Sequence, residues 1–444
     1  MTAPAELEAD SLAHSQTDSH SHTRGPTRSH TRSRWSAGLP AVCLGWVWAR
    51  LCIAAGFATA HLMVDRLDTP RGSEQIQQGL FTWDGAFYRG LAQQWYSRPA
   101  LGSLGGVSGA VSGAVSGASG EEARFFPVYP ALARTLGPIL GGHADWALIA
   151  ISNIAAFLGA WVLWKLASEV LDGREVREVR GAHGAALSSG ADPLGIANRS
   201  AVLVAIFPAA FVLAFAYSEG LALLVVAGAL LALQRRNFVF AGLLALIAAA
   251  IRPVGGLLLV PIAVELLRAR PRPAWWNWVV GLGGPVAGLG LALLWIQRST
   301  GDLLLPLRLQ RQIRGGFQDP VTRVLEPIGE LFRGNFRDVY NLGFMILFLL
   351  LFLYMLLAYT GFGAQRGIAR LPSSWIAYAG VSLLLLLSSQ VTDSLGRYGL
   401  LVLPFVVALA SWSNRRWRYV VVGIACTAGL IWLTSEALLG RLVP

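Results

Sequence analysis

Long apolar runs alternate with short polar or arginine-containing segments along most of this chain. The first run, residues 40–63, is long enough to cross a bilayer as a helix, which takes about 20 residues. Ten further runs lie near residues 144–164, 200–217, 219–234, 238–252, 254–267, 276–297, 341–360, 373–390, 398–412 and 419–438. The pattern predicts an all-α, polytopic transmembrane helix bundle of about eleven spans.

Residues 1–36 break this pattern. They consist mainly of Ser, Thr, His, Asp and Arg, and they include almost no large apolar side chain. Such a segment buries too little apolar surface to offset the conformational entropy lost on ordering. We therefore expect a disordered tail at 1–36 and one transmembrane domain at 37–444. The arginines that precede the first run place this tail in the cytoplasm.

Arginines at the ends of the runs indicate which segments face the cytoplasm. Cytoplasmic segments of membrane proteins are enriched in Lys and Arg. If the chain starts in the cytoplasm and changes side at each span, segment 298–340 lies outside, although it holds seven arginines. Either the span count is off by one, or this segment binds anions. The segments placed inside are arginine-rich and lie at 165–199, 235–236, 268–272, 366–370 and 415–418.

The longest connection, residues 64–143, is expected on the outside. Its middle, residues 102–120, is rich in Val, Ser, Gly and Ala and is typical of a flexible insertion. The flanking segments, 81–96 and 124–134, carry aromatic and charged residues at helical spacing, which predicts helices lying in the membrane interface. Because long structureless loops are uncommon, this connection is a candidate for function.

Composition narrows the class of protein. The chain is 54% hydrophobic and 14% charged, whereas soluble domains are about 25% charged, so a soluble multidomain protein is excluded. Lys and Arg outnumber Asp and Glu by 36 to 25, but the arginines are scattered between apolar runs, which favours membrane lipids over nucleic acid as partners. The three cysteines lie in apolar runs, and no spaced ligand set is present, so we expect neither a metal nor a cofactor.

Polar residues gather at the outside ends of the predicted spans. An ionisable group at mid-bilayer costs about 2.5–3.5 kcal/mol on insertion scales, so such groups need a reason. Their occurrence on one face in six separate segments favours one shared polar site over unrelated loop residues. These residues are Asp84 beside Trp83, Tyr217 with Ser218 and Glu219, Arg252, Asp302, Gln390 with Asp393, and Arg397 with Tyr398.

A carboxylate in an outside loop, with arginines nearby and no metal-ligand cluster, suits group transfer from a lipid-linked phosphate donor. The carboxylate would accept a proton from the acceptor hydroxyl, and the arginines would hold the departing phosphate by charge-assisted hydrogen bonds. The sequence contains no Walker motif, Gly-rich phosphate loop or His-containing triad, so nucleotide-driven pumps and serine hydrolases gain no support.

Several short motifs follow one another in a fixed order. They are Thr82–Tyr88 (TWDGAFY), Ala123–Pro130 (ARFFPVYP), Ala216–Glu219 (AYSE), Arg252 followed by Gly255, Thr300–Asp302 (TGD), and Gly396–Tyr398 (GRY). In order and spacing they resemble the PIG-V type mannosyltransferases, the GPI mannosyltransferase II family within the GT-C membrane glycosyltransferases. The resemblance covers about residues 40–412.

This resemblance implies a GT-C fold and a reaction. The family transfers mannose, with inversion, from a polyprenyl-phosphate-mannose donor to a lipid- or protein-linked glycan acceptor on the extracytoplasmic face. By the resemblance, Asp84 is the candidate general base, Glu219 shapes the acceptor or sugar site, and Arg252 and Arg397 lie near the donor phosphate. The candidate substrate-binding residues are Trp83, Arg124, Phe126, Tyr217, Glu219, Arg252, Asp302, Gln390, Asp393 and Arg397.

Two other functions stay open. A lipid-linked sugar transporter or flippase would also need arginines and a polar cavity, but it should carry mid-span ionisable residues on several helices, whereas only Arg50 is so placed. We expect Arg50 to face the bundle and pair with a carboxylate or a backbone carbonyl. The other alternative is an inactive family member that acts as a scaffold. The preference for Arg over Lys indicates a GC-rich bacterial genome, hence a bacterial plasma membrane.

Overall fold

A computed structural model describes one helical unit that begins at Trp35. Within the described ranges the regular elements are all helices, apart from one isolated bridge between Phe317 and Ser389, which confirms the all-α class. Most of the predicted tail and the whole 102–120 tract lie outside the described residues. The ranges described are 35–67, 70–96, 121–181, 192–333, 339–360, 370–389 and 394–442.

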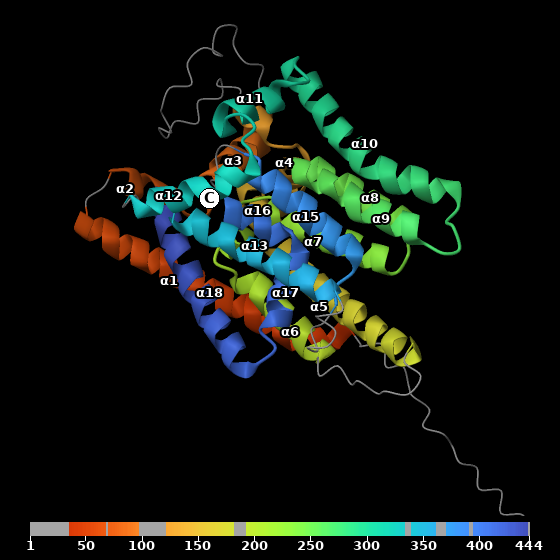
Figure 1. The fold of residues 1–444 in the computed structure, drawn as a ribbon. Coiled ribbons are helices and arrows are strands. Elements are labelled where there is room, and N and C mark those ends of the chain that lie inside the picture. The colour runs from red at the N-terminus through yellow and green to blue at the C-terminus, as the bar shows by residue number, and fades with distance from the viewer. Residues whose placement is uncertain are drawn as a thin grey trace, which may run out of the picture. The chain divides into compact units, whose positions relative to one another are not determined.

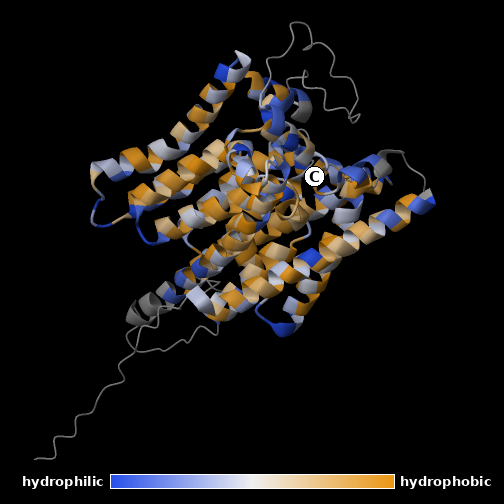
Figure 2. Ribbon diagram, turned by 180° about the vertical axis from the view of Figure 1, so that it is seen from behind, coloured by the Kyte–Doolittle hydropathy of each residue, from blue (hydrophilic) through white to orange (hydrophobic). Residues whose placement is uncertain are grey.

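Within the described ranges, five helices are long and apolar enough to cross a membrane, in agreement with the pattern of apolar runs (Figures 1 and 2). A sixth candidate is a broken one, in which α16 (Leu395–Leu401) and α17 (Leu403–Trp412) meet at an angle of 86°. These helices support an integral membrane protein. The five are α1 (Leu39–Leu67), α5 (Ala144–Gly181), α10 (Trp275–Thr300), α13 (Val339–Tyr359) and α18 (Arg416–Leu438).

The other predicted spans correspond to shorter apolar helices, so the count of eleven stays a prediction. Among the described residues, four apolar helices of 14 to 16 residues match predicted spans: α6 (Pro193–Ile206), α7 (Glu219–Gln234), α8 (Phe238–Ile251) and α15 (Ser373–Leu387). The run predicted at 254–267 divides into η7 (Pro253–Leu258) and α9 (Leu259–Arg268).

Proline explains two of the breaks. The predicted span 200–217 is wrong in its second half, because α6 ends at Ile206, directly before Phe207 and Pro208. The residue before a proline is pushed out of the helical region, so a helix stops there. The predicted span 398–412 breaks at Val402, because the ring of Pro404 would clash with the carbonyl group four residues earlier in a continuous helix.

Small residues set the closest helix contacts. Helix α10 packs along α8 and α9 on one side of the unit (Figure 1). Gly284 and Gly288, spaced as in a GxxxG motif, face α8, and a methyl group built on Gly288 would come within 2.0 Å of the Leu246 carbonyl oxygen. The backbones of these two helices therefore touch where larger side chains would hold them apart.

Two of the connections contain short helices. The first connection contains α2 (Pro70–Gln78), η2 (Gly79–Phe81), α3 (Asp84–Gln94), η4 (Glu121–Arg124), α4 (Val128–Leu136) and η5 (Gly137–Leu140). Helices α3 and α4 are the two that the aromatic spacing predicted, and Leu91 and Tyr129 on them are fully buried in a second apolar core. The connection at 298–340 contains α11 (Leu305–Arg314) and α12 (Pro320–Phe332).

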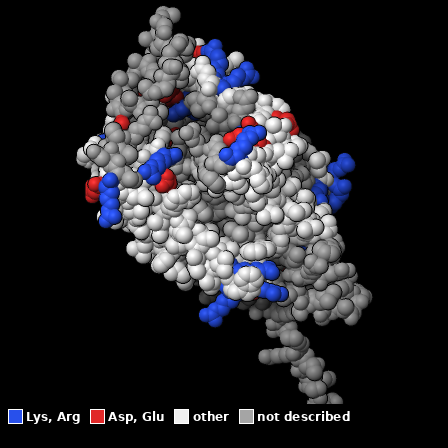
Figure 3. All heavy atoms as spheres, turned by 60° about the vertical axis from the view of Figure 1, so that its left-hand side comes forward, with Lys and Arg blue, Asp and Glu red and all other residues white. Residues whose placement is uncertain are grey.

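Charged side chains on the face shown in Figure 3 gather in two zones with a broad uncharged surface between them. The upper zone mixes Lys and Arg with Asp and Glu, whereas the lower group visible there is basic. An uncharged belt between two charged zones is typical of a helical membrane protein.

Candidate functional site

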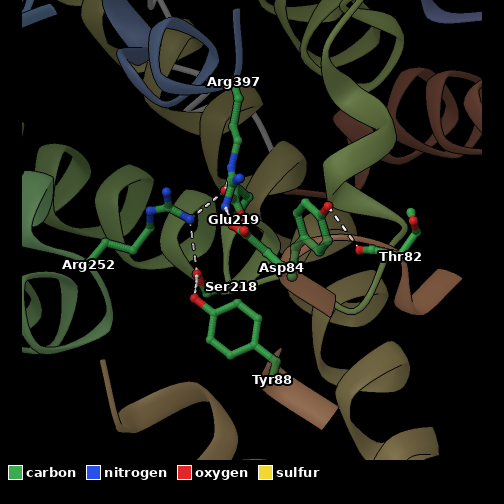
Figure 4. A network of polar contacts seen from close by, with 8 residues as sticks. Thr82, Asp84, Tyr88, Ser218, Glu219, Arg252 and Arg397 are labelled. Atoms are coloured by element: carbon green, nitrogen blue, oxygen red, sulfur yellow. Dashed lines mark hydrogen bonds and ion pairs between the residues drawn. The ribbon is translucent and has the colours of Figure 1, made fainter. Parts of the chain in front are cut away.

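Four segments that are far apart in the sequence meet in one buried ion-pair network (Figure 4). Asp84 is the first residue of α3, Glu219 is the first residue of α7, Arg252 directly follows α8, and Arg397 lies in α16. Asp84 and Arg397 are 313 residues apart in the chain. The fold therefore assembles this site from most of its length.

The local chain geometry explains where each charge points. Asp84 and Glu219 stand in the first turns of their helices, where the partial positive charge of the helix N-terminus favours a carboxylate. Arg252 has extended backbone angles, φ −150° and ψ 139°, because Pro253 excludes the helical conformation from the preceding residue. The side chain of Arg252 thus leaves the line of α8 and reaches the network.

Glu219 is the centre of the network. Its Oε1 atom accepts hydrogen bonds from Nε of Arg397 and from Nη1 of Arg252. Nη2 of Arg397 donates to Oδ2 of Asp84 at 2.5 Å. Glu219 is fully buried, while the Asp84 side chain is 23% exposed. Two carboxylates thus balance two guanidinium groups, which is how buried charges are tolerated.

The second carboxylate oxygen of Glu219 has a different environment. Oε2 is buried and has no hydrogen-bond partner among the described residues. A buried carboxylate oxygen without a donor costs free energy, because water no longer solvates it.

Ser218 and Tyr88 extend the network beyond the predicted residues (Figure 4). Nη1 of Arg252 donates to Oγ of Ser218 at 3.1 Å, and the Tyr88 hydroxyl lies 2.8 Å from the same oxygen. Burial raises the pKa of Tyr88, so its hydroxyl stays protonated. Tyr88 could have been predicted from the sequence, because it lies four residues after Asp84 and residues four apart lie on the same face of a helix.

Tyrosine rings cover the arginines. The guanidinium carbon of Arg397 lies 4.9 Å from the ring centre of Tyr217, and that of Arg252 lies 5.3 Å from the ring centre of Tyr398. Stacking on an aromatic ring stabilises a cation. The Tyr217 hydroxyl also donates to the Thr82 carbonyl oxygen at 3.2 Å, which ties the turn before α3 to α7 (Figure 4).

The Asp84 carboxylate is held ionised. Burial alone would raise its pKa, but the positive charges of Arg397 and then Arg124 lower it below its ordinary value of 3.8. Arg124 does this from a stacked position, with its guanidinium carbon 4.5 Å from the ring centre of Phe87 and 4.9 Å from that of Phe125. Arg124 therefore acts on the network through its charge.

The remaining predicted residues lie elsewhere. The Trp83 indole N–H donates to the Ala437 carbonyl oxygen at 2.8 Å, so this side chain joins the turn before α3 to α18. Phe126 is buried among the apolar side chains of the second core. Asp302 pairs with Arg308 and accepts from the Leu304 N–H at 3.0 Å, apart from the four-residue network. Gln390 and Asp393 are outside the described residues.

Arg50 is bundle-facing, as predicted, but the expected partner was wrong. Its Nη2 atom donates to Oδ1 of Asn153 at 2.6 Å, and its guanidinium carbon lies 4.4 Å from the ring centre of Trp46. An amide thus takes the place of the expected carboxylate or carbonyl. Asn153 in turn donates to the carbonyl oxygens of Ile149 and Ala214, both at 2.9 Å, so Arg50 belongs to a helix-packing contact.

The described residues contain no group of three or more His, Cys, Asp or Glu placed to hold a metal ion. The network itself provides two carboxylates, two guanidinium groups and the hydroxyl groups of Tyr88 and Ser218. Such a set can accept a proton, hold an anion and orient hydroxyl groups.

Comparison of the chain with known proteins finds no family model, no curated protein and no solved structure that matches it. The resemblance to a mannosyltransferase family thus rests on the sequence motifs alone.

Proposed function

We propose that this protein is an integral membrane glycosyltransferase that moves mannose from a polyprenyl-phosphate-mannose donor to a lipid- or protein-linked glycan acceptor, at the extracytoplasmic face of a bacterial plasma membrane. One observation carries the proposal: the buried network that joins Asp84, Glu219, Arg252 and Arg397. These are the residues that the family resemblance assigns to the base, the sugar or acceptor site and the donor phosphate.

In the proposed reaction the acceptor hydroxyl loses its proton to the Asp84 carboxylate as its oxygen attacks the anomeric carbon of the donor sugar. The bond between that carbon and the phosphate oxygen breaks, and its electron pair leaves with the phosphate. Arg252 and Arg397 then stabilise the added negative charge by charge-assisted hydrogen bonds.

The position of Asp84 suits this role. Its side chain is 23% exposed and ionised, whereas Glu219 is fully buried between two arginines, so Asp84 is the carboxylate that an acceptor can reach. A flippase would need charged groups along several helices, whereas Arg50, the one ionisable residue placed mid-span by the sequence pattern, contacts Asn153 and Trp46.

The experiment is transfer of radiolabelled mannose from synthetic polyprenyl phosphate mannose by purified protein in detergent. We expect Asp84→Asn to keep the fold and donor binding and to lower the rate of transfer by roughly 10²- to 10⁴-fold, the usual contribution of a positioned base. Asp145→Asn is the matched control, because among the described residues Asp145 pairs with the half-exposed Arg89 alone, at 3.5 Å. It should transfer at the rate of the unchanged protein.

Three results separate the alternatives, and a fourth tests whether a metal is required. Transfer at an unchanged rate by Asp84→Asn rules out the assigned base. Absence of transfer by the unchanged protein, with retained donor binding, favours the scaffold or the flippase. Movement of a fluorescent lipid-linked sugar across vesicle bilayers then favours the flippase over the scaffold. Transfer that persists in EDTA shows that no divalent metal is required.

A further inference from the structure

The connection at 298–340 carries seven arginines at the end of the bundle that holds the candidate site. Its helix α11 packs against η4, and both helices contribute side chains to the second apolar core, which also contains Leu91 of α3. The two long connections therefore lie on the same side of the bundle. A span count that is off by one between them would place them on opposite sides, so a miscount does not explain these arginines.

Carboxylates of the same connection balance some of this charge. Three of the seven arginines form ion pairs, and the side chains of two others lie outside the described residues. The pairs are Arg308–Asp302, Arg323–Glu326 and Arg333–Glu330. The remaining two, Arg298 and Arg311, are exposed, and neither has a carboxylate partner in the part of the chain that the structure describes. These two cations are therefore available to an external anion.

Arg298 continues an exposed apolar stripe of α10. The side chains three, four and seven residues before it are Trp295, Leu294 and Leu291, which are 45%, 50% and 56% exposed. Residues at these spacings share one face of a helix. Lipid chains cover such a face on a membrane span, and tryptophan is enriched where those chains meet the headgroups. Arg298, one turn beyond Trp295, therefore lies at the level of the lipid phosphates.

Helix α11 has the same spacing on its exposed face, with leucine and arginine mixed. Leu305 and Leu309 are buried in the second core, which turns the opposite face away from the protein. That face, counted from the residue before the helix, consists of Leu304, Leu307, Arg308 and Arg311. Its two leucines are 53% and 57% exposed. A helix with apolar and basic side chains on one exposed face lies in the membrane interface, with leucines among the lipid chains and arginines at the headgroups.

We propose that the end of α10 and the exposed face of α11, which follows it (Figure 1), form one surface that binds anionic phospholipid headgroups of the surrounding membrane. This α10–α11 surface consists of Arg298, Leu304, Leu307, Arg308 and Arg311. Arg308 is balanced by Asp302, but Arg298 and Arg311 leave two uncompensated positive charges. A zwitterionic headgroup would bring its own cation to these arginines, whereas an anionic headgroup brings net negative charge. Lipid binding at this surface does not depend on the proposed function.

Binding is measured as amide hydrogen exchange of residues 298–314 in the full-length protein, reconstituted without donor into nanodiscs. One set of discs contains phosphatidylcholine alone, and the other contains equal parts of phosphatidylcholine and phosphatidylglycerol. An anionic membrane surface attracts each nearby arginine by an amount equivalent to about a fivefold change in an equilibrium constant. Because these amides exchange through local opening, we expect phosphatidylglycerol to slow their exchange by about fivefold for each of the two unpaired arginines.

Charge variants show whether the arginines cause the effect. Arg298→Gln combined with Arg311→Gln should remove the difference between the two lipids, whereas Arg311→Lys, which keeps the positive charge, should retain it. The melting temperature of the double variant in detergent should not change, because both side chains are exposed and unpaired in the described chain. Arg441→Gln is the matched control, since Arg441 is 42% exposed, pairs with Glu436 at 3.7 Å and lies beyond the end of α18. It should keep the full lipid effect.

Equal exchange in the two lipids, or a lipid effect that survives in the double variant, would overturn the inference. Protection that needs two copies of the protein in one disc would assign the surface to a second copy instead. Protection by inorganic phosphate in discs of phosphatidylcholine alone would assign it to a free anion.

Discussion

Glu219→Gln tests whether one buried carboxylate holds the two arginines in place. Glu219 is fully buried, and its Oε1 atom accepts from both Arg252 and Arg397. With glutamine at this position, Asp84 is the carboxylate left in the network, and it accepts a hydrogen bond from Arg397, whereas no bond between Asp84 and Arg252 is present among the described residues. Removing one member of a buried ion pair costs about 3–5 kcal/mol, because the partner stays buried without compensation.

The loss should be visible in thermal unfolding followed by tryptophan fluorescence, since the chain contains 16 tryptophans. We expect the melting temperature of Glu219→Gln in detergent to fall by roughly 5 °C or more. Glu330→Gln is the matched control: Glu330 pairs with Arg333 at 2.8 Å, but these side chains are 39% and 75% exposed. Exposed pairs contribute about 0–1 kcal/mol, so this variant should unfold almost unchanged.

A second substitution examines the mechanism of the loss. If Glu219→Gln is destabilised by uncompensated arginine charge, adding Arg252→Met should recover part of the lost stability, because it removes one of the two unpaired cations. Equal melting temperatures for Glu219→Gln and Glu330→Gln would refute the reasoning, and so would a double variant whose losses simply add.

Two further predictions concern the base and the helix packing. Because the pKa of Asp84 lies below 3.8, the transfer rate should stay level from about pH 7 down to about pH 5 and should fall only as the pH nears that pKa. The stability that the ionised carboxylate contributes is lost over the same range. A decline in rate centred near pH 6 would indicate another base. Gly288→Ala should lower the melting temperature, because its methyl group would meet the Leu246 carbonyl oxygen at 2.0 Å and overpacking costs about 1–3 kcal/mol. Gly283→Ala, with open space around it, should not, and equal losses would contradict the close contact of α8 with α10.

The positions of the long helices could be predicted because a continuous apolar run is a local property of the sequence. The run at 341–360 became α13, Val339–Tyr359, within two residues at each end. The short helices were harder, since their ends depend on single prolines such as Pro208 and Pro404 inside otherwise apolar runs. The angle of 86° between α16 and α17 follows from packing against neighbours and has no local signal.

The members of the polar network were predictable as a set of charges, but their pairing was not. Charge at the ends of apolar runs marks Asp84, Glu219, Arg252 and Arg397 as unusual. Which arginine meets which carboxylate depends on the spatial order of helices.

The distance along the chain between the members of the network has a consequence for biosynthesis. Arg397 follows Arg252 by 145 residues, and at roughly 5–20 residues per second the ribosome needs about 7–30 s to make this stretch. During that interval Asp84 lacks the guanidinium group that it will bind and Glu219 has only one of its two arginines. The network is therefore completed only after α16 has been made, and a chain that stops before Arg397 leaves the Asp84 carboxylate without this guanidinium group and Glu219 with one arginine.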